Sequence, residues 1–375
     1  MSADSLTFYI SGHGFGHASR AIEVLRALRA RRPDLRLIVR TTVPRWLFEV
    51  SVDGLEYDPV ECDTGIVQID SLRLDEAATI DKAEAFYATF DARVAREADA
   101  LRESRTALIV GDIPPLAPAA AAAAGLRSIL IGNFTWDWIY AGYAEFSIGA
   151  THLLDRIRDA YRRTTLALRL PMHGGFEPML AATRDIPFIA RHAVHSRHEV
   201  AQRFGLPADR PIALVSFGGH GLHDLAPDDL ARNDRYTILT TARHPFAKRP
   251  APNVFTLDER EIYRDGFRYE DLVAAADVVV TKPGYGIVAE AIANDTAILY
   301  TSRGHFVEYE VMVEALPRLT RCRYIPMPDL LRGHWQGHLD RLLELPPVAV
   351  KPATNGAEVA ADTILAMLRD LRASA

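Results

Sequence analysis

The sequence predicts an α/β fold made of two doubly wound, Rossmann-like domains that face each other across a cleft. Strand-like apolar runs alternate with helix-like segments along the chain, which is typical of parallel sheets covered by helices. The chain has 375 residues, more than one hydrophobic core usually supports. A stretch rich in proline and glycine interrupts the alternation at 170–178, so we expect a linker near 170–190.

Each predicted element follows from local apolar spacing and from the turn residues beside it. In the first half, strands are expected at 6–10, 36–41, 107–111 and 128–132, with helices between them. After the linker, strands are expected at 212–216, 236–240, 253–256, 277–280 and 296–300. The predicted domains are 1–175 and 186–355, followed by a C-terminal helix within 356–375 that could pack back on the N-terminal domain.

Composition places the chain among soluble globular proteins, with 49% hydrophobic and 25% charged residues. A formal net charge of −6 argues against a general nucleic-acid binder, which would carry a basic excess. Cys62 and Cys322 lack metal-ligand spacing and suit a reducing compartment. No targeting segment or membrane-length apolar run is visible, so we expect a cytoplasmic protein. The patch Trp46–Phe48 leaves contact with a membrane surface open, and packing of a helix onto the core is the alternative.

A glycine-rich turn at 11–20 is the most informative segment of the chain. It lies between a predicted strand and a predicted helix, an arrangement that favours polar or anionic ligands. His13 and His17 lie in this turn, and histidine is well suited to move a proton near neutral pH. The glycines at 12, 14 and 16 do not have dinucleotide spacing, so the pattern disfavours a nicotinamide cofactor. A plain strand-to-helix connection is the alternative.

The second half has a glycine turn of its own directly after the predicted strand 212–216. Backbone amides of Gly218 and Gly219 could point at a phosphate, and His220 could add a donor. A metal set of His220, His223 and Asp224 is disfavoured because no distant fourth ligand is apparent. We therefore expect no metal here.

A second polar turn follows the predicted strand 277–280. Lys282 and a glycine-rich helix start would hold a diphosphate, and Glu290, one turn deeper, could accept ribose hydroxyls. A capped, solvated glutamate is the alternative for Glu290. One half thus offers proton transfer and the other a nucleotide diphosphate, which suits group transfer from an activated sugar.

The chain resembles GT-B glycosyltransferases, a group that includes the peptidoglycan N-acetylglucosaminyltransferase and plant UDP-sugar transferases. More specifically, it resembles the glycosyltransferase-like amino-terminal region of L-arabinokinases. The resemblance covers nearly the whole chain and is carried by Gly12–Ala18, Gly111–Pro115, Asn133–Tyr140, Phe217–Gly219 and Lys282–Gly286. The galactokinase-type domain of arabinokinases has no counterpart within these residues, so sugar kinase activity is not implied.

The resemblance implies a catalytic pair. In plant-type transferases, a histidine at the end of the first loop is the general base, and an aspartate after a later strand orients it. His17 and Asp112 match these positions. His13 is the competing candidate for the base, and Asp112 could instead cap the turn before Pro114.

The resemblance also implies a donor site in the second half. Lys282, Gly284 and Glu290 keep the spacing of the plant pattern, with lysine in place of its phosphate-binding histidine. Ile287 stands where that pattern has a hydroxyl residue, which removes one phosphate hydrogen bond. The remaining donor-binding candidates are Tyr285 and Gly286 in the same turn, Glu308 and Glu310 after the next strand, and Arg191 at the domain entry.

Acceptor-binding candidates lie in the first half. Gly14, Phe15 and Gly16 belong to the first turn, and indole rings of Trp136 and Trp138 could stack on a sugar while Asp137 binds its hydroxyls. Core packing of the two tryptophans is the alternative.

The predicted function is an inverting, metal-independent glycosyltransferase that moves a sugar from a nucleotide sugar to a hydroxyl or amine acceptor. A UDP-linked donor is expected as co-substrate, with no cofactor. Direct attack by a deprotonated acceptor would invert the anomeric centre, and no carboxylate pair indicates a retaining route. A non-catalytic nucleotide-sugar sensor or accessory protein and a nucleotide-sugar epimerase are the alternatives. Acceptor, sugar, base and oligomeric state stay open.

Overall fold

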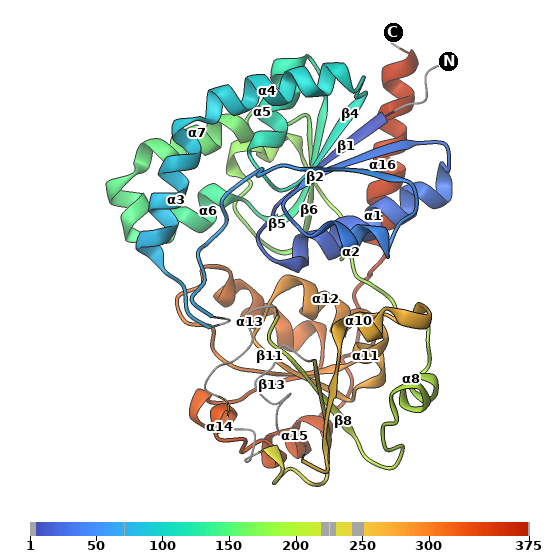
Figure 1. The fold of residues 1–375 in the computed structure, drawn as a ribbon. Coiled ribbons are helices and arrows are strands. Elements are labelled where there is room, and N and C mark those ends of the chain that lie inside the picture. Colours follow the sequence, from blue (N-terminus) through green and yellow to red (C-terminus); the bar gives the residue numbers. More distant parts are fainter. Residues whose placement is uncertain (1–4, 71, 219–224, 226–229, 242–250, 374–375) are drawn as a thin grey trace. The chain divides into compact units, whose positions relative to one another are not determined.

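A computed structural model describes residues 5–70, 72–218, 225, 230–241 and 251–373 of the chain. The chain forms two compact units (Figure 1). Unit 1 consists of Met1–Val67, Asp75–Ile189 and Asn355–Ala375, and unit 2 consists of Gln68–Leu74 and Ala190–Thr354.

Unit 1 is built on a seven-stranded sheet in which all paired strands are parallel. The strand order is β3-β2-β1-β4-β5-β6-β7, so the chain reverses direction across the sheet between β1 and β4. In a doubly wound sheet, this reversal point is where ligands bind, at the carboxyl ends of the strands. The strands are β1 Ser5–Ile10, β2 Arg36–Thr41, β3 Leu55–Pro59, β4 Leu108–Asp112, β5 Ser128–Phe134, β6 Leu166–Gly174 and β7 Thr183–Asp185.

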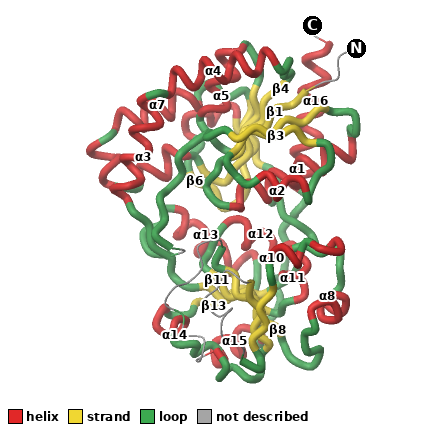
Figure 2. The backbone as a smooth tube through the Cα atoms, in the orientation of Figure 1, coloured by secondary structure: helices red, strands yellow, loops and turns green. Residues whose placement is uncertain are grey.

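Helices cover both faces of the unit 1 sheet (Figure 2). They are α1 Phe15–Arg31, α2 Arg45–Glu49, α3 Glu76–Ala88, α4 Phe90–Glu103, α5 Leu116–Ala124, α6 Trp136–Ala141, α7 Thr151–Tyr161 and α16 Gly356–Ala373. Every residue of the central strand β1 is buried, because both its faces are covered. α16 lies beside α1 (Figure 1), and residues of both helices share one hydrophobic core with β1, β2 and β4. The C-terminal helix therefore packs on the N-terminal unit, as the sequence allowed.

Unit 2 has a six-stranded parallel sheet of order β10-β9-β8-β11-β12-β13. Its strands are β8 Ile212–Ser216, β9 Thr237–Thr241, β10 Val254–Leu257, β11 Val278–Thr281, β12 Ala297–Tyr300 and β13 Cys322–Tyr324. Its helices are α8 Arg197–Phe204, α10 Glu259–Ile262, α11 Tyr269–Ala275, α12 Tyr285–Ala293, α13 Glu308–Leu319, α14 Met327–Leu331 and α15 Gln336–Leu343. Buried aliphatic side chains form a core on each side of this sheet.

The nine predicted strands are confirmed to within two residues at each end, but the predicted linker is wrong in its first part. β6 continues to Gly174, and β7 adds a further strand before the chain leaves unit 1 after Ile189. The register between β5 and β6 shifts between Gly132 and Phe134, and Pro171 lies in the corresponding part of β6. A proline is tolerated in a strand at such an irregularity, so Pro171 does not end β6.

A short segment of the first half also departs from the predicted domain 1–175. Gln68–Leu74 belongs to unit 2, where Leu72 packs against the hydrophobic core. Local apolar spacing could not assign this segment, because its partners lie far away in the sequence.

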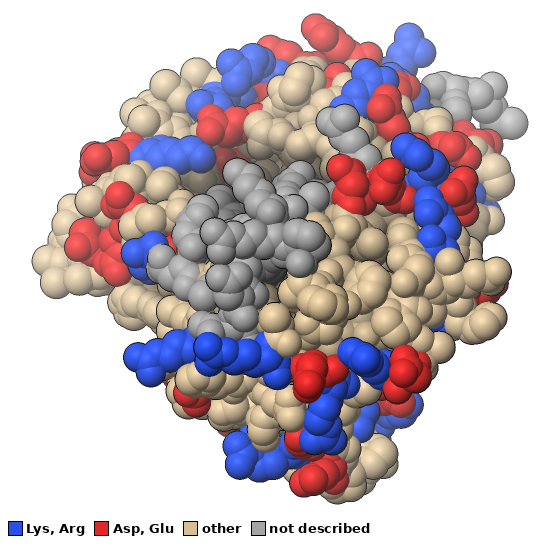
Figure 3. All heavy atoms as spheres, turned by 60° about the horizontal axis from the view of Figure 1, so that its bottom comes forward, with Lys and Arg blue, Asp and Glu red and all other residues tan. Residues whose placement is uncertain are grey.

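Charged side chains of both signs lie side by side on the face drawn in Figure 3. This mixture agrees with the small net charge of −6. In the described part of the chain, no helix combines the length and hydrophobicity needed to cross a membrane.

Candidate functional site

The first glycine-rich turn joins the end of β1 to the start of α1. Gly14 is the N-cap of α1 and has φ +76°, a left-handed conformation that favours glycine. Gly14 and Gly16 are exposed, and a Cβ atom added at either would meet open space. Phe15 is half-buried, whereas His17, in the first turn of α1, is buried. The turn therefore presents backbone to its surroundings and directs one imidazole inward.

His17 meets Asp112 at the carboxyl ends of two neighbouring strands. β1 and β4 run in parallel register with Ile10 opposite Asp112, and Asp112 is the last residue of β4. His17 Nδ1 lies 2.7 Å from Asp112 Oδ1. Burial would raise the pKa of Asp112, but the Arg20 charge and hydrogen bonds from Arg20 and His17 outweigh it and lower that pKa. An ionised Asp112 can only accept, so a neutral His17 ring would carry its proton on Nδ1 and its lone pair on Nε2.

Arg20 is a third member of this cluster, and the sequence analysis did not single it out. Its Nε donates to Asp112 Oδ2 at 2.7 Å, and its Nη2 donates to Asp112 Oδ1. Its Nη1 donates to Asn133 Oδ1, while Asn133 Nδ2 donates to the Pro171 carbonyl at 2.7 Å. Arg20 follows His17 by three residues on α1, so both side chains lie on one helix face. That spacing is the signal that could have found it.

His13, the competing base, faces a different partner. The backbone N–H of Ile66 donates to His13 Nδ1 at 3.3 Å. In the neutral ring, the proton then lies on Nε2, which makes Nε2 a donor rather than a base. The ring packs so closely on Gly65 that a Cβ atom there would lie 2.5 Å from His13 Nδ1. The local geometry thus gives His13 and His17 opposite tautomers.

Asp63 is a second buried carboxylate of this region that the sequence analysis missed. It accepts hydrogen bonds from Ser11 Oγ at 3.0 Å and from Trp136 Nε1 at 2.8 Å. Burial raises the pKa of Asp63, although the His17 ring and these two hydrogen bonds oppose the shift. No motif precedes Asp63 in the sequence, so only the fold places it here.

The residues of the aromatic segment expected to bind the acceptor differ in burial. Trp136 is 1% exposed, stacks on Tyr140 and is committed to Asp63, so its ring is a core residue and not an open sugar platform. Asp137 is buried and pairs with Arg158 at 3.3 Å. Trp138 is half-buried and packs on Gly174. Trp138 is the member of this segment that keeps exposed surface for stacking.

The predicted diphosphate turn lies at the carboxyl end of β11 in unit 2. Lys282 follows β11 directly, and Gly284 is the N-cap of α12, which begins with Tyr285 and Gly286. Burial, followed by the positive charge of Arg303, holds the pKa of Lys282 well below its usual range, although Glu308 opposes the shift. Among the described residues, none forms a hydrogen bond or ion pair with the Lys282 ammonium group. A phosphate oxygen would supply the missing partner.

The loop after β12 brings Arg303 and Glu308 close to Lys282. Arg303 Nη1 pairs with Glu308 Oε1 at 2.6 Å, and both side chains are buried. Glu310, by contrast, is exposed. Of the two glutamates expected to contact a donor sugar, only Glu308 is therefore held in a defined position by the protein.

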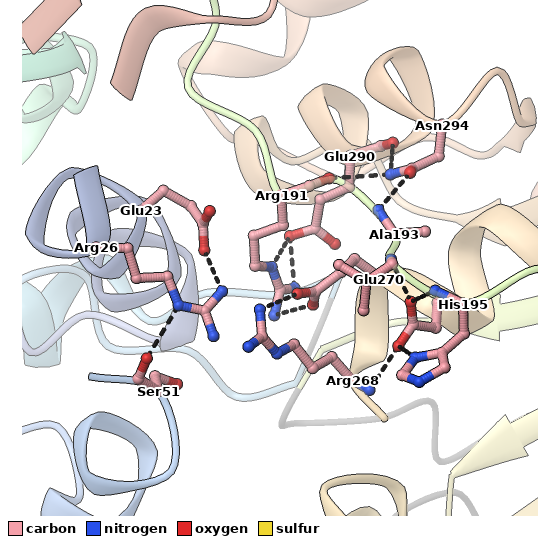
Figure 4. Close-up of polar contacts among 12 residues, drawn as sticks. Glu23, Arg26, Ser51, Arg191, Ala193, His195, Arg268, Glu270, Glu290 and Asn294 are labelled. Carbon is pink, nitrogen blue, oxygen red and sulfur yellow. Dashed lines mark hydrogen bonds and ion pairs between the residues drawn. The ribbon is translucent and has the colours of Figure 1, made fainter. Parts of the chain in front are cut away.

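Buried Glu290 on α12 and partly buried Arg191 form one ion pair (Figure 4). Arg191 donates from Nε at 2.7 Å and from Nη2 at 2.5 Å to the same oxygen, Glu290 Oε1. Its Nη1 lies 3.2 Å from Glu270 Oε2. Asn294 Nδ2 donates to the Arg191 carbonyl and thus ties the entry of unit 2 to the end of α12. Glu290 was predicted to bind ribose hydroxyls and Arg191 to bind the donor, and the structure joins the two side chains to each other.

Some predicted donor residues fall outside the described residues, namely Gly219 and His220. Gly218, after β8, is described and has φ +70°. Within the described ranges, no group of three or more histidine, cysteine, aspartate or glutamate residues could hold a metal ion.

Comparison with known proteins gives one sequence relative and a set of structural ones. No family profile matches the chain. The chain is 31% identical over 363 residues to L-arabinokinase of Arabidopsis thaliana. The matched region covers 94% of this chain and 33% of that protein. The chain thus spans about a third of the length of the curated relative it matches.

Solved glycosyltransferases have the same fold. The kitacinnamycin glycotransferase superposes with a TM-score of 0.62 at 18% identity, covering 100% of this chain and 96% of that one. Medicago truncatula UGT71G1, solved with UDP-glucose, superposes with a TM-score of 0.62 at 9% identity, covering 98% of each chain. The predicted GT-B fold and the resemblance to L-arabinokinase are confirmed by these comparisons.

Proposed function

We propose that this protein is a glycosyltransferase that moves a sugar from a nucleotide sugar to a hydroxyl or amine acceptor, with His17 as general base. The observation that carries the proposal is the 2.7 Å contact between His17 Nδ1 and Asp112 Oδ1 at the carboxyl edge of a GT-B sheet. In a neutral ring, this contact leaves the lone pair on Nε2 of His17, a residue that directly follows the exposed glycines of the turn. A positioned base of this kind contributes about 10²–10⁴ in rate.

In the proposed reaction, His17 Nε2 takes the proton of the acceptor hydroxyl. The acceptor oxygen forms a bond to the anomeric carbon of the donor sugar as the bond from that carbon to the diphosphate oxygen breaks. The configuration at the anomeric carbon inverts because the attack is direct. The nucleoside diphosphate departs with the bonding electrons, and Asp112 stabilises the imidazolium left on His17.

The donor would bind to unit 2 at the turn after β11. Lys282 and the backbone N–H groups at the start of α12 supply positive charge to the departing diphosphate. We infer from this charge that the reaction proceeds without a metal ion. The UDP-glucose bound to UGT71G1 supports a UDP-sugar as the donor class.

A nucleotide-sugar-binding protein without turnover is the second candidate. Arg20 already occupies both oxygens of Asp112, which reduces the charge available to the imidazolium. The match to one third of a kinase of different overall activity also suits an accessory role.

The decisive experiment compares the natural chain with His17→Ala. Thermal shift against nucleotides and UDP-sugars, with and without magnesium, first identifies the donor. A ligand at about a hundred times its dissociation constant stabilises by about 2.7 kcal/mol. Release of UDP from that donor, to water and to a panel of acceptors, is then measured. We expect His17→Ala to lower turnover about 10²–10⁴-fold while the thermal shift with donor persists.

His173→Ala is the matched control, since His173 is an exposed histidine of unit 1 and should leave turnover unchanged. Equal turnover in the natural chain and His17→Ala would remove His17 as the base. Donor binding without turnover in any variant would favour the sensor.

A further inference from the structure

A residue other than His17, Arg20, holds the Asp112 carboxylate in place. Arg20 contacts both carboxylate oxygens with two different nitrogens, and its side chain is only 9% exposed. Such a fork is planar and rigid, so it allows one orientation of the carboxylate. Arg20 is anchored in turn by Asn133, whose own amide is fixed to the Pro171 carbonyl. Three strands and one helix therefore determine where Asp112 Oδ1 points.

The charge of Arg20 acts on the same pair. An arginine stays protonated at every accessible pH, so it offsets the negative charge that Asp112 presents to the imidazole. Arg20 Nη2 also lies 3.2 Å from His17 Nδ1. A carboxylate stabilises a neighbouring imidazolium less when a guanidinium shares it.

Other charged groups face His17 from the elements around it. Asp63, in the segment before α3, attracts the protonated ring. Lys82 on α3 acts on Asp63 and donates to the Thr64 carbonyl. His13 is a further titratable group here, since His13 and His17 both contact the Trp136 ring. None of these groups touches both oxygens of Asp112, so Arg20 alone combines the orienting contact with the compensating charge in the described structure.

We propose that Arg20 is a positioning residue of this site: its fork sets the orientation of Asp112, and its charge limits how strongly Asp112 holds a proton on His17. The inference rests on the proposed role of His17 as a base, for which a neutral ring with a lone pair on Nε2 is required. Its primary test does not depend on turnover.

The test follows the His17 ring by nitrogen-15 NMR of the ligand-free protein across pH. The His17 signals are assigned from their loss in His17→Gln. Arg20→Met removes the charge and the fork together. We expect the pH midpoint of the His17 signals to move up by about one unit, because Asp112 is no longer compensated. Arg20→Lys keeps the charge without the fork. In Arg20→Lys we expect the pH midpoint of the His17 signals to stay close to that of the natural chain. We also expect the His17 ring to be a mixture of its two tautomers.

Arg31→Met is the matched control. Arg31 lies on the same helix and also pairs with a carboxylate, Asp362 at 2.8 Å, but it is about 16 Å further along the helix axis. It should leave both signals unchanged. If Arg20→Met does not fold, Asn133→Ala replaces it in the test, because this variant removes only the anchor of Arg20. We then expect a smaller upward shift of the His17 pH midpoint.

A His17 midpoint and tautomer in Arg20→Met equal to those in Arg31→Met would overturn the inference. Kinetics then separate it from the proposed function. We expect Arg20→Lys to lower kcat about 10²-fold with KM nearly unchanged, and Arg20→Met to move the acid limb of activity to higher pH. Altered NMR signals in a chain that transfers no sugar would retain the role of Arg20 and reject the glycosyltransferase. Loss of turnover in His17→Ala, together with unaltered NMR signals in Arg20→Met, would retain the glycosyltransferase and reject the role of Arg20.

Discussion

At the scale of single residues, hydrogen-bond partners decide on which nitrogen a neutral histidine ring carries its proton. The sequence places His13 and His17 in one turn and leaves both open. In the structure, His13 Nδ1 accepts a hydrogen bond from a backbone N–H, whereas His17 Nδ1 faces an ionised carboxylate. An acceptor at Nδ1 leaves a proton on Nε2, and a donor at Nδ1 leaves a lone pair there. Two chemically identical side chains thus favour different tautomers.

Lys282 gives a prediction at the same scale. Burial holds the pKa of Lys282 well below its usual range, so this amine loses its proton at a lower pH than an ordinary lysine does. A diphosphate favours the protonated amine, so binding should take up protons, and affinity should fall as pH rises. Calorimetry of UDP binding in buffers of different ionisation enthalpy measures this uptake. Lys282→Arg stays charged and should show less uptake and a flatter pH dependence. Equal proton uptake in both proteins would show that Lys282 is not the group that titrates.

At the scale of elements, the loop after β12 depends on a close backbone approach. Gly304 has φ +60°, and a Cβ atom there would lie 2.7 Å from the Leu72 carbonyl oxygen, within unit 2. Leu72 therefore lies directly against the loop that carries Arg303. A side chain at 304 would have to displace backbone rather than a flexible side chain.

We expect Gly304→Ala to lower the free energy of unfolding by about 2–3 kcal/mol, from left-handed strain and the contact with Leu72 together. Gly266→Ala is the control, since Gly266 has φ +84° and open space around its Cβ position. It should cost about 1 kcal/mol from strain alone. Urea denaturation of both variants gives the comparison. If the two costs are the same, the Leu72 contact contributes nothing to stability.

At the scale of the whole molecule, the last helix completes the core of the first unit. Ile364 and Leu368 of α16 are buried in the same cluster as Leu25 of α1 and Leu6 of β1. Unit 1 is thus assembled from three separate stretches of chain, the last of which begins at Asn355. Folding of this unit requires contacts between residues more than 300 positions apart, which are slow to form.

We expect Ile364→Ala to destabilise unit 1 by about 2–5 kcal/mol, because it leaves a cavity in that core. Arg369→Ala, at an exposed position of the same helix, should change stability by no more than about 0.5 kcal/mol. Thermal unfolding followed by tryptophan fluorescence compares them, since Trp46, Trp136 and Trp138 belong to unit 1. Similar small effects of both substitutions would mean that α16 is dispensable for unit 1.

The resemblance to GT-B glycosyltransferases indicated the pairing of His17 with Asp112, a contact that the structure contains. The sequence by itself determined the fold class, nine of the strands and the turn after β11. These follow from local features: uninterrupted apolar runs, glycine-rich turns and short motifs whose spacing can be read along the chain. Strands β3 and β13 were not predicted from the sequence, because β3 is half-buried and β13 has three residues. β6 and β7 escaped because Pro171 and its neighbouring glycines imitate a linker.

Only the tertiary structure decided which residues share a site. Arg20 pairs with Asp112 across 92 positions, Asp63 with Trp136 across 73, and Arg191 with Glu290 across 99. The tertiary structure also assigns Gln68–Leu74 to unit 2 and buries the Trp136 ring in the core. The physical reason is that hydrogen bonds and ion pairs depend on distance in space, and parallel sheets bring together strand ends that are far apart in the sequence.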